Sequence, residues 1–493
     1  MTGETVNQTL ERMYNALPVG LQHLICSAEG YRLQRMRFGP DFDPVLRDVE
    51  ARSTMPAADV AVLRDRGFRE FVSDAAAGSA FYRAQSVFQP AAAGQAFRAD
   101  DLPILDKLAV QTGAARIART DVPRALTAST SGSTGMGLRF PVTNEAVLRQ
   151  WATWWRFRRW HGIERDEWCG YFGGRPIVPI GRRGVPFWRY NVPGRQVLFS
   201  GSHLSADTWR AYAAELSTRR LAWLHGYPSL LALLASYLVE QRVTLGYDVR
   251  WVTTSAENLL PAQAELIERA FGVRPRQHYG MAEGAANASE CPSGRLHVDE
   301  DFAFMEFVPV EHGTGYRVVG TNLTNRAFPL IRYDVGDVAQ VSGQTCGCGR
   351  PGRIIDGIDG RREDYVVLPS GALVGRLDHI FKNQVHVREA QIYQPDRTRV
   401  VLRLVGATDF TTRDEQALIG TARTWLGNSL RIEIERLEAL PRTPAGKLRF
   451  VVSDVAAARL EERPAASPRG AGPADAAASE VEPGRTEAEP RWT

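Results

Sequence analysis

The stretch YDVRWVTTSAENL at residues 247–259, followed by PAQAELIERAFG at 261–272, decides the fold class. The first part predicts a strand that enters a loop. The second predicts an amphipathic helix that stops at Gly272, because glycine readily closes a helix. The same alternation of apolar β-rich runs and helical patterns extends from Leu126 to about Asp359. Alternating strands and helices indicate α/β layers with parallel strands, so we predict an α/β fold.

The chain divides into regions of different composition on either side of this stretch. Residues 1–120 are rich in Ala, Arg, Leu and Glu, which predicts a mostly helical lead-in to a large N-terminal domain, residues 1–360. Short strands and one helix after Gly360 predict a small α+β C-terminal domain, residues 361–455. Residues 456–493 have almost no large apolar side chains and cannot offset their ordering entropy, so we predict a disordered tail.

Composition and charge exclude several classes of partner. The 493 residues include 60 Lys and Arg and 56 Asp and Glu, a net charge of +4. An excess this small gives no electrostatic reason to expect a nucleic-acid or membrane partner. The five cysteines are too few and too oddly numbered for a disulfide framework and suit a reducing compartment.

The sequence contains no recognisable targeting or membrane segment. Its N-terminus lacks the basic region and apolar core of a signal peptide. The most apolar stretch, Leu221 to Val239, is interrupted by His225, Gly226 and Pro228. Its continuous run is well short of the roughly 20 apolar residues that a membrane span needs. A buried helix starting near Pro228 fits better, and we expect a cytoplasmic protein.

The loop TASTSGSTGMG, from Thr127 to Gly137, has the chemistry of a phosphate-binding loop. Its glycines allow tight turns and close approach to a ligand, and its Ser and Thr hydroxyls add donors to the backbone N–H groups. The spacing differs from the Walker pattern, and no Lys follows the glycines, so a P-loop NTPase is not supported. Taken alone, the loop fits a phosphate site and a surface linker about equally well.

Further motifs follow the loop in a fixed order. They are HGYPSLL at 225–231, TSAEN at 254–258, HYGMAEG at 278–284, RYDVGD at 332–337, GRREDYVV at 360–367 and PRTPAGKLRF at 441–450. With TSGSTG at 130–135, this series resembles the adenylate-forming superfamily of acyl-CoA synthetases and adenylation domains. The nearest branch resembles phenylacetate–CoA ligase and its capsule-biosynthesis-type relatives. The resemblance covers about Leu126 to Phe450, and it implies a large ATP-binding domain followed by a small mobile one.

The resemblance implies how ATP would be held. The TSGSTG loop would cradle the β- and γ-phosphates, Tyr279 would lie against adenine, and Asp337 would accept the ribose hydroxyl protons with Arg361 close by. The full implied nucleotide set is Ser131, Gly132, Ser133, Thr134, Gly135, Ala256, Glu257, Tyr279, Gly280, Asp337 and Arg361.

The resemblance also assigns the catalytic and acid-binding residues. Glu283 matches the family's Mg²⁺ ligand, an acidic oxygen that suits a hard cation bridging phosphates. Lys447 matches a mobile lysine that reaches the α-phosphate, a point charge on a flexible stem. By family position, His225 and Tyr227 lie near the acid pocket. Rotation of the small domain about a hinge near residues 362–364 would withdraw Lys447 and admit a thiol.

One position departs from the family pattern. The residue before the acid of the YGxTE motif is usually Thr, whose hydroxyl touches the α-phosphate, but here it is Ala282. A hydrogen bond to a charged group is typically worth about 1.5–3 kcal/mol. This departure puts ordinary adenylation in doubt, though not the fold.

Two tight pairs of potential metal ligands lie about fifty residues apart. Cys291 and His297 form C-x5-H, and Cys346 and Cys348 form C-x-C. Three thiolates and one imidazole make a closed tetrahedral set, as in structural zinc sites. Relatives in the resembled branch have a similar arrangement. We predict a structural Zn²⁺, against the alternative of two unrelated pairs with Cys348 packed as a small hydrophobe.

The segment WATWWRFRRWHG, residues 151–162, interleaves aromatic side chains with arginines. Such a pattern can stack on nucleic acid. However, Trp151, Trp154, Trp155 and Arg158 share one helical face, and such a stripe is more typical of core packing. We expect it to pack behind the phosphate loop.

The resemblance therefore predicts an ATP-dependent ligase that uses Mg²⁺. It would activate a carboxylic acid as its acyl-adenylate, release pyrophosphate and transfer the acyl group to CoA. Tyr227 and Ala256 would allow a planar aryl acid. Two alternatives stay open: an adenylating enzyme whose acceptor is an amine or a carrier-protein thiol, and a non-catalytic nucleotide-binding homologue for which Ala282 would be a symptom. The motifs report neither the acid nor the acceptor.

Overall fold

The computed structural model describes most of the chain. The described residues are 12–129, 138–173, 177–179, 181–205, 207–310, 315–361, 366–369, 373–374, 377–381, 386–442 and 448–455. Several expectations lie outside these residues: the phosphate-loop positions, Lys447, the hinge at 362–364 and the tail at 456–493. The phosphate-loop positions concerned are Ser131, Gly132, Ser133, Thr134 and Gly135.

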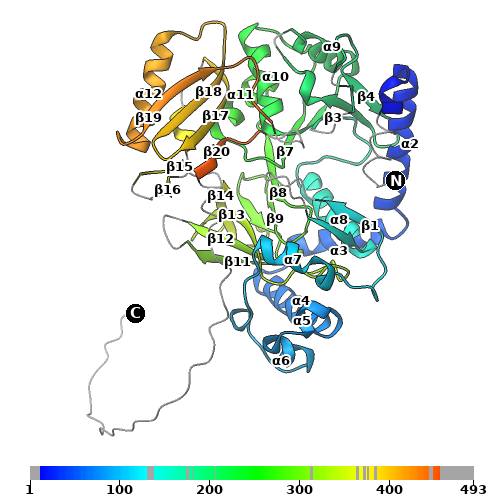
Figure 1. The fold of residues 1–493 in the computed structure, drawn as a ribbon. Coiled ribbons are helices and arrows are strands. Elements are labelled where there is room, and N and C mark those ends of the chain that lie inside the picture. Colours follow the sequence, from blue (N-terminus) through cyan, green and yellow to red (C-terminus); the bar gives the residue numbers. More distant parts are fainter. Residues whose placement is uncertain are drawn as a thin grey trace.

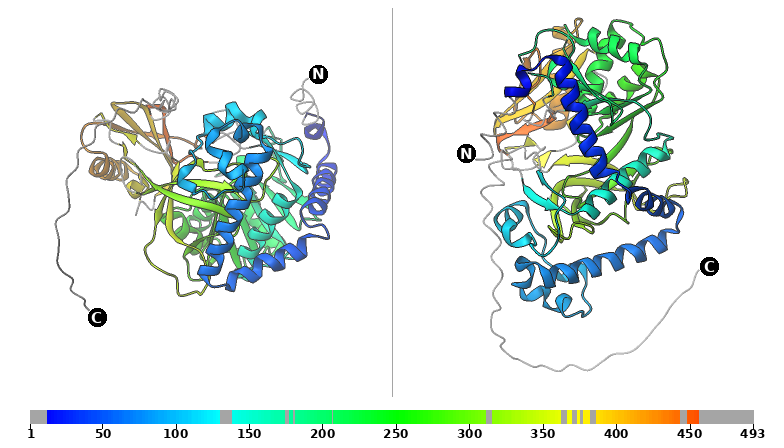
Figure 2. Two further views of the ribbon diagram at one scale, coloured as in Figure 1. Left: turned by 90° about the horizontal axis from the view of Figure 1, so that it is seen from below. Right: turned by 90° about the vertical axis from the view of Figure 1, so that its right-hand side faces the viewer.

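Helices dominate the described part of residues 12–120 (Figure 1). They are α2 (Val19–Arg37), α3 (Phe42–Ala51), α4 (Ala57–Gly78), α5 (Ala80–Arg83), α6 (Gln89–Ala92) and α7 (Lys107–Ile117). Short 3-10 turns occur at Arg52–Thr54, Ser86–Phe88, Ala99–Asp101, Gly201–His203 and Leu377–Phe381. The views in Figure 2 show α4 to α6 gathered at one end of the molecule, whereas α2 runs along its side.

A twelve-stranded sheet forms the centre of the large domain, in the order β11-β12-β13-β14-β10-β9-β8-β7-β6-β3-β5-β4. Its parallel part consists of β3 (Cys169–Gly173), β5 (Gln196–Ser200), β6 (Trp223–Gly226), β7 (Trp251–Ser255) and β8 (Arg276–Gly280). The accompanying helices are α8 (Asn144–Trp160), α9 (Trp209–Arg219), α10 (Pro228–Glu240) and α11 (Pro261–Phe271). Proline occupies the first turn of α10, and Gly272 closes α11 with a positive φ of 74°, as the sequence predicts.

The remaining strands of this sheet correct the expectation of parallel strands throughout residues 126–359. Strand β4 (Trp188–Asn191) pairs antiparallel with β5. Antiparallel pairing also joins β9 (Asn287–Glu290), β10 (Leu296–Val298), β11 (Ala303–Pro309), β12 (Tyr316–Asn322), β13 (Tyr333–Val341) and β14 (Ile354–Arg361). No helix of the described residues separates β9 to β14, and parallel pairing requires a long crossover. Strands β1 (Leu126–Ser129) and β2 (Arg139–Val142) form a separate antiparallel pair around residues 130–137.

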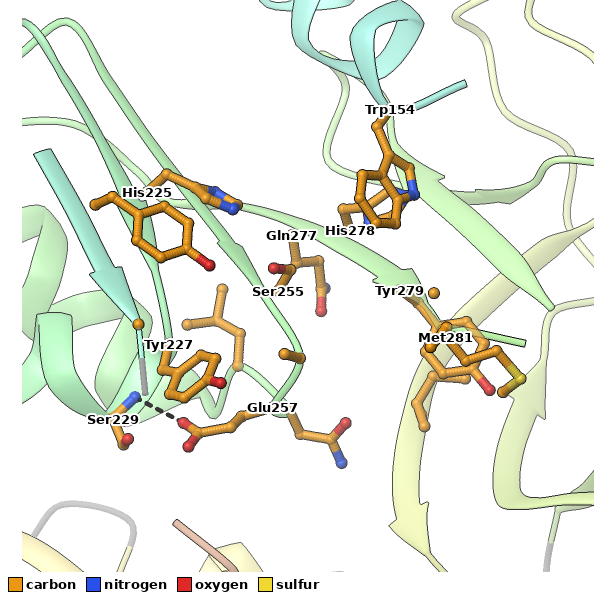
Figure 3. Close-up of a pocket in the computed structure, with 18 of the residues that line it drawn as sticks. Trp154, His225, Tyr227, Ser229, Ser255, Glu257, Gln277, His278, Tyr279 and Met281 are labelled. Carbon is orange, nitrogen blue, oxygen red and sulfur yellow. Dashed lines mark hydrogen bonds between the residues drawn. The ribbon is translucent and has the colours of Figure 1, made fainter. Parts of the chain in front are cut away.

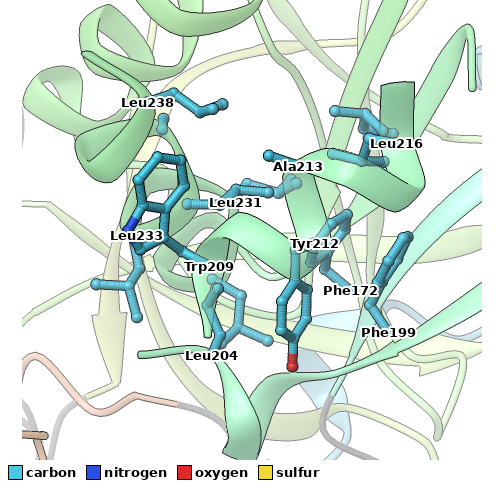
Figure 4. Packing of buried hydrophobic residues seen from close by; sticks show 14 of the residues in the cluster. Phe172, Phe199, Leu204, Trp209, Tyr212, Ala213, Leu216, Leu231, Leu233 and Leu238 are labelled. Atoms are coloured by element: carbon cyan, nitrogen blue, oxygen red, sulfur yellow. The ribbon is translucent and has the colours of Figure 1, made fainter. Parts of the chain in front are cut away.

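The main apolar core lies between the parallel strands and helices α9 to α11. Figure 4 shows part of it, with Trp209 of α9 beside leucines of α10 and Tyr212 of α9 beside Phe172 and Phe199. The Trp209 and Tyr212 side chains are at most 2% exposed. Nearly every residue of α10 is buried, which explains the apolar run at 221–239 without a membrane. Among the described helices, none is both long and apolar enough to cross a bilayer.

The C-terminal region forms its own sheet and core. Strands β17 (Val387–Asp396), β18 (Arg399–Gly406), β19 (Arg431–Arg436) and β20 (Val451–Ser453) make a sheet in the order β19-β18-β17-β20. Helix α12 (Thr412–Leu426) packs on it, and β15 (Val366–Val367) pairs with β16 (Leu373–Val374). In Figure 1 this region is yellow to orange and stands beside α10.

Candidate active site

A large cleft of about 2490 Å³ extends along the carboxyl ends of β6, β7 and β8. In open parallel sheets, ligands bind at these ends because the loops there converge. Helix α8 lines the cleft on one side, and residues of the small domain, including Leu448 and Phe450, line it on another. Figure 3 shows His225 and Tyr227 on one side of this pocket, with Trp154 and His278 across from them. The cleft therefore collects side chains from both domains.

One part of the cleft brings together several residues that the resemblance assigns to the nucleotide. The Tyr279 hydroxyl donates to Oδ2 of Asp337 at 2.7 Å, although the two lie on different strands, β8 and β13. Asp337 is paired in register with Arg361 on β14. Glu283, in the loop after β8, also lines the cleft. At Gly280 an added Cβ would lie 2.7 Å from Oδ1 of Asn287, so a side chain at this position would displace the Asn287 side chain.

The predicted phosphate loop itself lies outside the described residues, but its flanking strand reaches the cleft. Ala128 and Ser129, the last residues of β1, line the cleft. They pair with Phe140 and Arg139 of β2, so the two ends of the segment 130–137 are held together. The geometry places the entry to the loop at the same cleft as Tyr279 and Asp337.

Ala256 and Glu257 lie at the carboxyl end of β7. Ala256 has a φ of 71°, a left-handed conformation that costs a non-glycine residue about 1–2 kcal/mol. The Glu257 carboxylate accepts hydrogen bonds from the backbone N–H of Ser229 at 3.2 Å and of Leu448 at 2.6 Å. Burial raises the pKa of this carboxyl. Glu257 therefore joins the start of α10 to the residue that follows Lys447.

Further contacts hold the small domain against α10. Arg442 donates to Oγ of Ser229 at 2.8 Å and pairs with Glu389. Arg388 pairs with Glu240 and lies over the Tyr237 ring at 4.7 Å. Sequence reasoning did not identify these contacts, because nothing in the motifs reports which surfaces of the two domains meet.

The deep part of the cleft is lined by aromatic and imidazole side chains. His225 of β6 and Tyr227, the residue that follows this strand, both line the cleft. Nδ1 of His225 is 2.9 Å from Oγ1 of Thr253, which also accepts a hydrogen bond from Nε1 of Trp223 at 2.8 Å. Burial, followed by the charge of Arg158, lowers the pKa of His225 to about 3, so its ring is neutral at pH 7.

Helix α8 forms the wall of this deep part. Trp151, Trp154, Trp155 and Arg158 all line the cleft, which revises the expectation that this face is only core packing. Nε1 of Trp154 donates to Oδ1 of Asn287 at 3.3 Å, and the Trp154 ring lies 5.6 Å from His278. The sequence signal was present in the interleaved Trp and Arg residues, but helical spacing does not distinguish a cavity wall from a core. Arg158 and His278 are therefore site residues that the sequence analysis missed.

The four predicted metal ligands come together away from the deep pocket. One ligand atom from each of Cys291, His297, Cys346 and Cys348 lies within 4.8 Å of the others. The Sγ atoms of Cys291 and Cys346 are 3.8 Å apart, and Sγ of Cys348 is 3.4 Å from Nε2 of His297. Nδ1 of His297 lies 3.0 Å from the Pro351 carbonyl, which suits an imidazole that donates there and ligates through Nε2. The donor set and its outer partner fit a tetrahedral zinc ion.

Comparisons with known proteins give a consistent group of relatives. A family model described as the CapK C-terminal domain matches residues 366–454. Protein CapK of Staphylococcus aureus is 24% identical over 459 residues, covering 90% of this chain and 100% of that protein. The phenylacetate-coenzyme A ligase of Thermus thermophilus is 29% identical over 131 residues, covering 24% of this chain and 29% of that enzyme.

A solved structure shares the fold. The crystal structure of a 2-hydroxyisobutyryl-CoA ligase in the postadenylation state, in complex with 2-HIB-AMP, aligns with a TM-score of 0.62. The alignment covers 83% of this chain and 93% of that chain at 19% sequence identity. At this identity the likeness concerns the fold alone.

Proposed function

We propose that the chain is an adenylate-forming ligase that activates a carboxylic acid with ATP and transfers the acyl group to coenzyme A, which the similarity to phenylacetate-coenzyme A ligase and the shared fold support. The observation that carries the proposal is the meeting of two regions at one cleft. The Tyr279–Asp337 pair and Glu283 line this cleft from the large domain. From the small domain, the backbone N–H of Leu448, which follows Lys447, donates to Glu257 in the same cleft.

In the first step, a carboxylate oxygen of the acid attacks the α-phosphorus of ATP. The new O–P bond forms as the bond to the β-phosphate breaks, and pyrophosphate leaves. Negative charge grows on the phosphate oxygens, so positioning and positive charge dominate the catalysis. Lys447 would supply that charge, since Leu448 binds at the cleft. Glu283 is the residue that would hold a Mg²⁺, which neutralises phosphate charge when bound.

In the second step, the thiol sulfur of coenzyme A attacks the acyl carbon. The C–S bond forms, the bond to the AMP oxygen breaks, and the thiol proton leaves to solvent. The small domain contacts α10 through Glu257, Arg442 and Arg388, and these contacts would break if the domain turned to admit the thiol. An amine or a carrier-protein thiol could replace coenzyme A by the same displacement. The aromatic lining of the deep pocket favours an aryl acid.

Acid-dependent exchange of pyrophosphate into ATP tests the first step, with Lys447→Ala as the decisive variant. We expect exchange to fall about 100-fold or more in this variant, the usual effect of removing one charge-stabilising group. Arg413→Ala, which changes an exposed residue of α12, is the matched control and should keep wild-type exchange. Wild-type exchange in Lys447→Ala would contradict the lysine's role. ATP binding without exchange for any acid would instead favour a non-catalytic homologue, with Ala282→Thr the first change to test.

We also propose that Cys291, His297, Cys346 and Cys348 hold a structural Zn²⁺ that ties the strands after Glu283 to the loop before β14. Support comes from the convergence of four ligand atoms within 4.8 Å. Metal analysis of the purified protein should give about one equivalent of zinc, lost in Cys346→Ser. Cys26→Ser, at a cysteine that contacts Tyr14 instead, should keep the metal. A zinc-free wild-type protein would mean that these four side chains pack together without binding a metal.

A further inference from the structure

Arg158 carries a buried charge with no anionic partner in the part of the chain that the structure describes. The residue is 8% exposed, and its guanidinium carbon lies 4.7 Å from the Trp155 ring centroid and 5.2 Å from that of Trp223. Among the described residues, no carboxylate forms an ion pair with it. Burial lowers the pKa of Arg158 to about 10, so it remains charged at pH 7. A buried charge without a partner is costly and needs an explanation.

Two neighbouring polar atoms are also without partners. Nε1 of Trp155 and Nε2 of His278 are buried and have no hydrogen-bond partner within the described parts of the chain. Trp155 contacts the Arg158 guanidinium, and the charge of Arg158 contributes, after burial, to lowering the pKa of His278. Buried polar groups are almost always hydrogen-bonded in folded proteins. Two buried polar atoms without partners, beside a buried charge with no carboxylate partner among the described residues, point to a missing ligand.

These groups lie at the deep end of the proposed acid pocket. Trp223, His225 and Tyr227 alternate along β6 and the residue after it, so they face the same side of the sheet. Trp223 contacts Arg158, whereas Tyr227 lies at the mouth, next to the start of α10. Four residues of strand span about 13 Å, enough for an aromatic acid placed lengthwise. The titratable groups that interact with Arg158 are Cys169, Tyr171, His225 and His278, and none of them is a carboxylate.

We propose that the deep end of this pocket binds a second anionic group of the substrate, which would make the substrate an aromatic dicarboxylic acid. This inference rests on the proposed adenylation and specifies its substrate class. One carboxylate would react at the mouth, near Tyr227 and Gly280, and the other would pair with Arg158. A guanidinium offers a planar fork that matches a carboxylate, and the tryptophans provide flat walls for a ring. Exclusion of water makes such a pair stronger than at a surface.

The test compares diacids with monoacids of the same skeleton. The probes are benzene-1,4-dicarboxylate, 4-carboxyphenylacetate and 3-(4-carboxyphenyl)propanoate, against benzoate, phenylacetate and 3-phenylpropanoate. Calorimetric binding to the full-length protein and ATP–pyrophosphate exchange are measured for each pair. In the wild type we expect the best diacid to bind about 10- to 100-fold more tightly than its monoacid, the range for charged hydrogen bonds.

Arg158→Met and Arg158→Lys identify the residue responsible. Arg158→Met should bind the diacid and its monoacid within about 3-fold of each other while keeping its far-ultraviolet circular dichroism. Arg158→Lys retains the charge and should keep part of the preference for the diacid over its monoacid. It therefore tests the inference even if Arg158→Met fails to fold.

The outcomes separate this inference from the proposed function. If monoacids support exchange and bind as well as diacids, the diacid inference is overturned and adenylation stands. If diacids bind through Arg158 but no acid supports exchange, the anion site stands and adenylation fails. A diacid preference that persists unchanged in Arg158→Met would place the anion elsewhere and overturn the inference.

Discussion

Two arginines of helix α8, Arg156 and Arg158, are both buried but differ in their partners. Arg156 is 3% exposed, and its guanidinium donates to Asp299 at 2.7 Å and to Asp301 at 2.9 and 3.0 Å. Burial alone would lower the pKa of Arg156, but the charges of Asp301 and Asp299 outweigh burial and raise it. Arg158 lies two residues further along the helix, and its guanidinium contacts the rings of Trp155 and Trp223 instead of carboxylates.

The difference separates a structural charge from a functional one. Arg156 connects α8 to the loop between β10 and β11, and its partners are satisfied in turn: Asp299 also accepts from Ser289 at 2.8 Å and from Asn287 at 2.5 Å. Both carboxylates are therefore paired with a cation without a ligand, although Nε of Arg156 has no hydrogen-bond partner among the described residues. Arg158 faces the cleft, and nothing on the described protein completes its hydrogen bonds. A buried charge that the fold leaves unpaired is a candidate for recognition.

The largest expected effect is on stability and concerns Arg156. Arg156→Met leaves Asp299 and Asp301 buried without their cation, and breaking a buried pair in this way costs about 3–5 kcal/mol. Arg158→Met removes a buried charge that has no ion-pair partner among the described residues, so the free energy of unfolding should stay unchanged or rise by up to about 4 kcal/mol. Urea unfolding followed by circular dichroism compares the two variants. Equal losses would mean that Arg158 also has a structural partner and would remove the contrast.

The second effect is on the pH dependence of stability. Burial, followed by the charge of Arg158, lowers the pKa of His278 to about 3, against about 6.5 in the unfolded chain. Unfolded protein then binds the proton more readily, so stability is present above pH 6.5 and is lost as the pH falls toward 3. Between pH 7 and pH 5 this loss is about 2 kcal/mol for the residue.

Comparison of variants isolates the contribution of Arg158 to that loss. Without its charge, the pKa of His278 should rise toward 6.5, and Arg158→Met should lose less stability than the wild type between pH 7 and pH 5. Urea midpoints at the two pH values give the difference, to which His225 also contributes because the charge of Arg158 lowers its pKa as well. An unchanged pH dependence of stability would show that burial alone lowers the pKa of His278.

The sequence predicted the part of the molecule that local patterns encode. The strand at 251–255, the helix that begins at Pro228 and the helix that ends at Gly272 each have a local signal, and all three are confirmed. The order of motifs likewise indicated the adenylate-forming superfamily. The antiparallel strands β9 to β14 were missed because their pairing depends on short connections rather than on any residue type.

The contrast between Arg156 and Arg158 could not be predicted. Both belong to one aromatic and basic run, and their partners are 143 residues away for Arg156 and on β6 for Arg158. Helical spacing places them on different faces but does not say what those faces meet. The Cys/His cluster was predictable because thiols and imidazole have few other reasons to gather, and its four ligand atoms converge in the structure.

A smaller effect tests whether Arg158 acts through its charge or through its planar fork. Arg158→Lys keeps the charge but offers a point donor in place of two parallel N–H groups. We expect diacid affinity to fall about 10-fold, which is about 1.4 kcal/mol, and stability to stay near that of the wild type. Calorimetry with 4-carboxyphenylacetate measures the change. Full wild-type affinity in this variant would mean that a general positive field, rather than a paired carboxylate, holds the second group.

The smallest effect concerns the indole donor beside Arg158. Trp155→Phe keeps an aromatic wall but removes the Nε1–H group that has no acceptor in the described protein. If the distal carboxylate accepts from this group, diacid affinity should fall about 5-fold, or about 1 kcal/mol, with monoacid affinity unchanged. Trp160→Phe is the matched control, because Nε1 of Trp160 donates to Ser53 at 3.2 Å and lies on the same helix outside the cleft. Equal diacid binding by both variants would mean that Arg158 alone binds the second carboxylate and that Trp155 only lines the pocket.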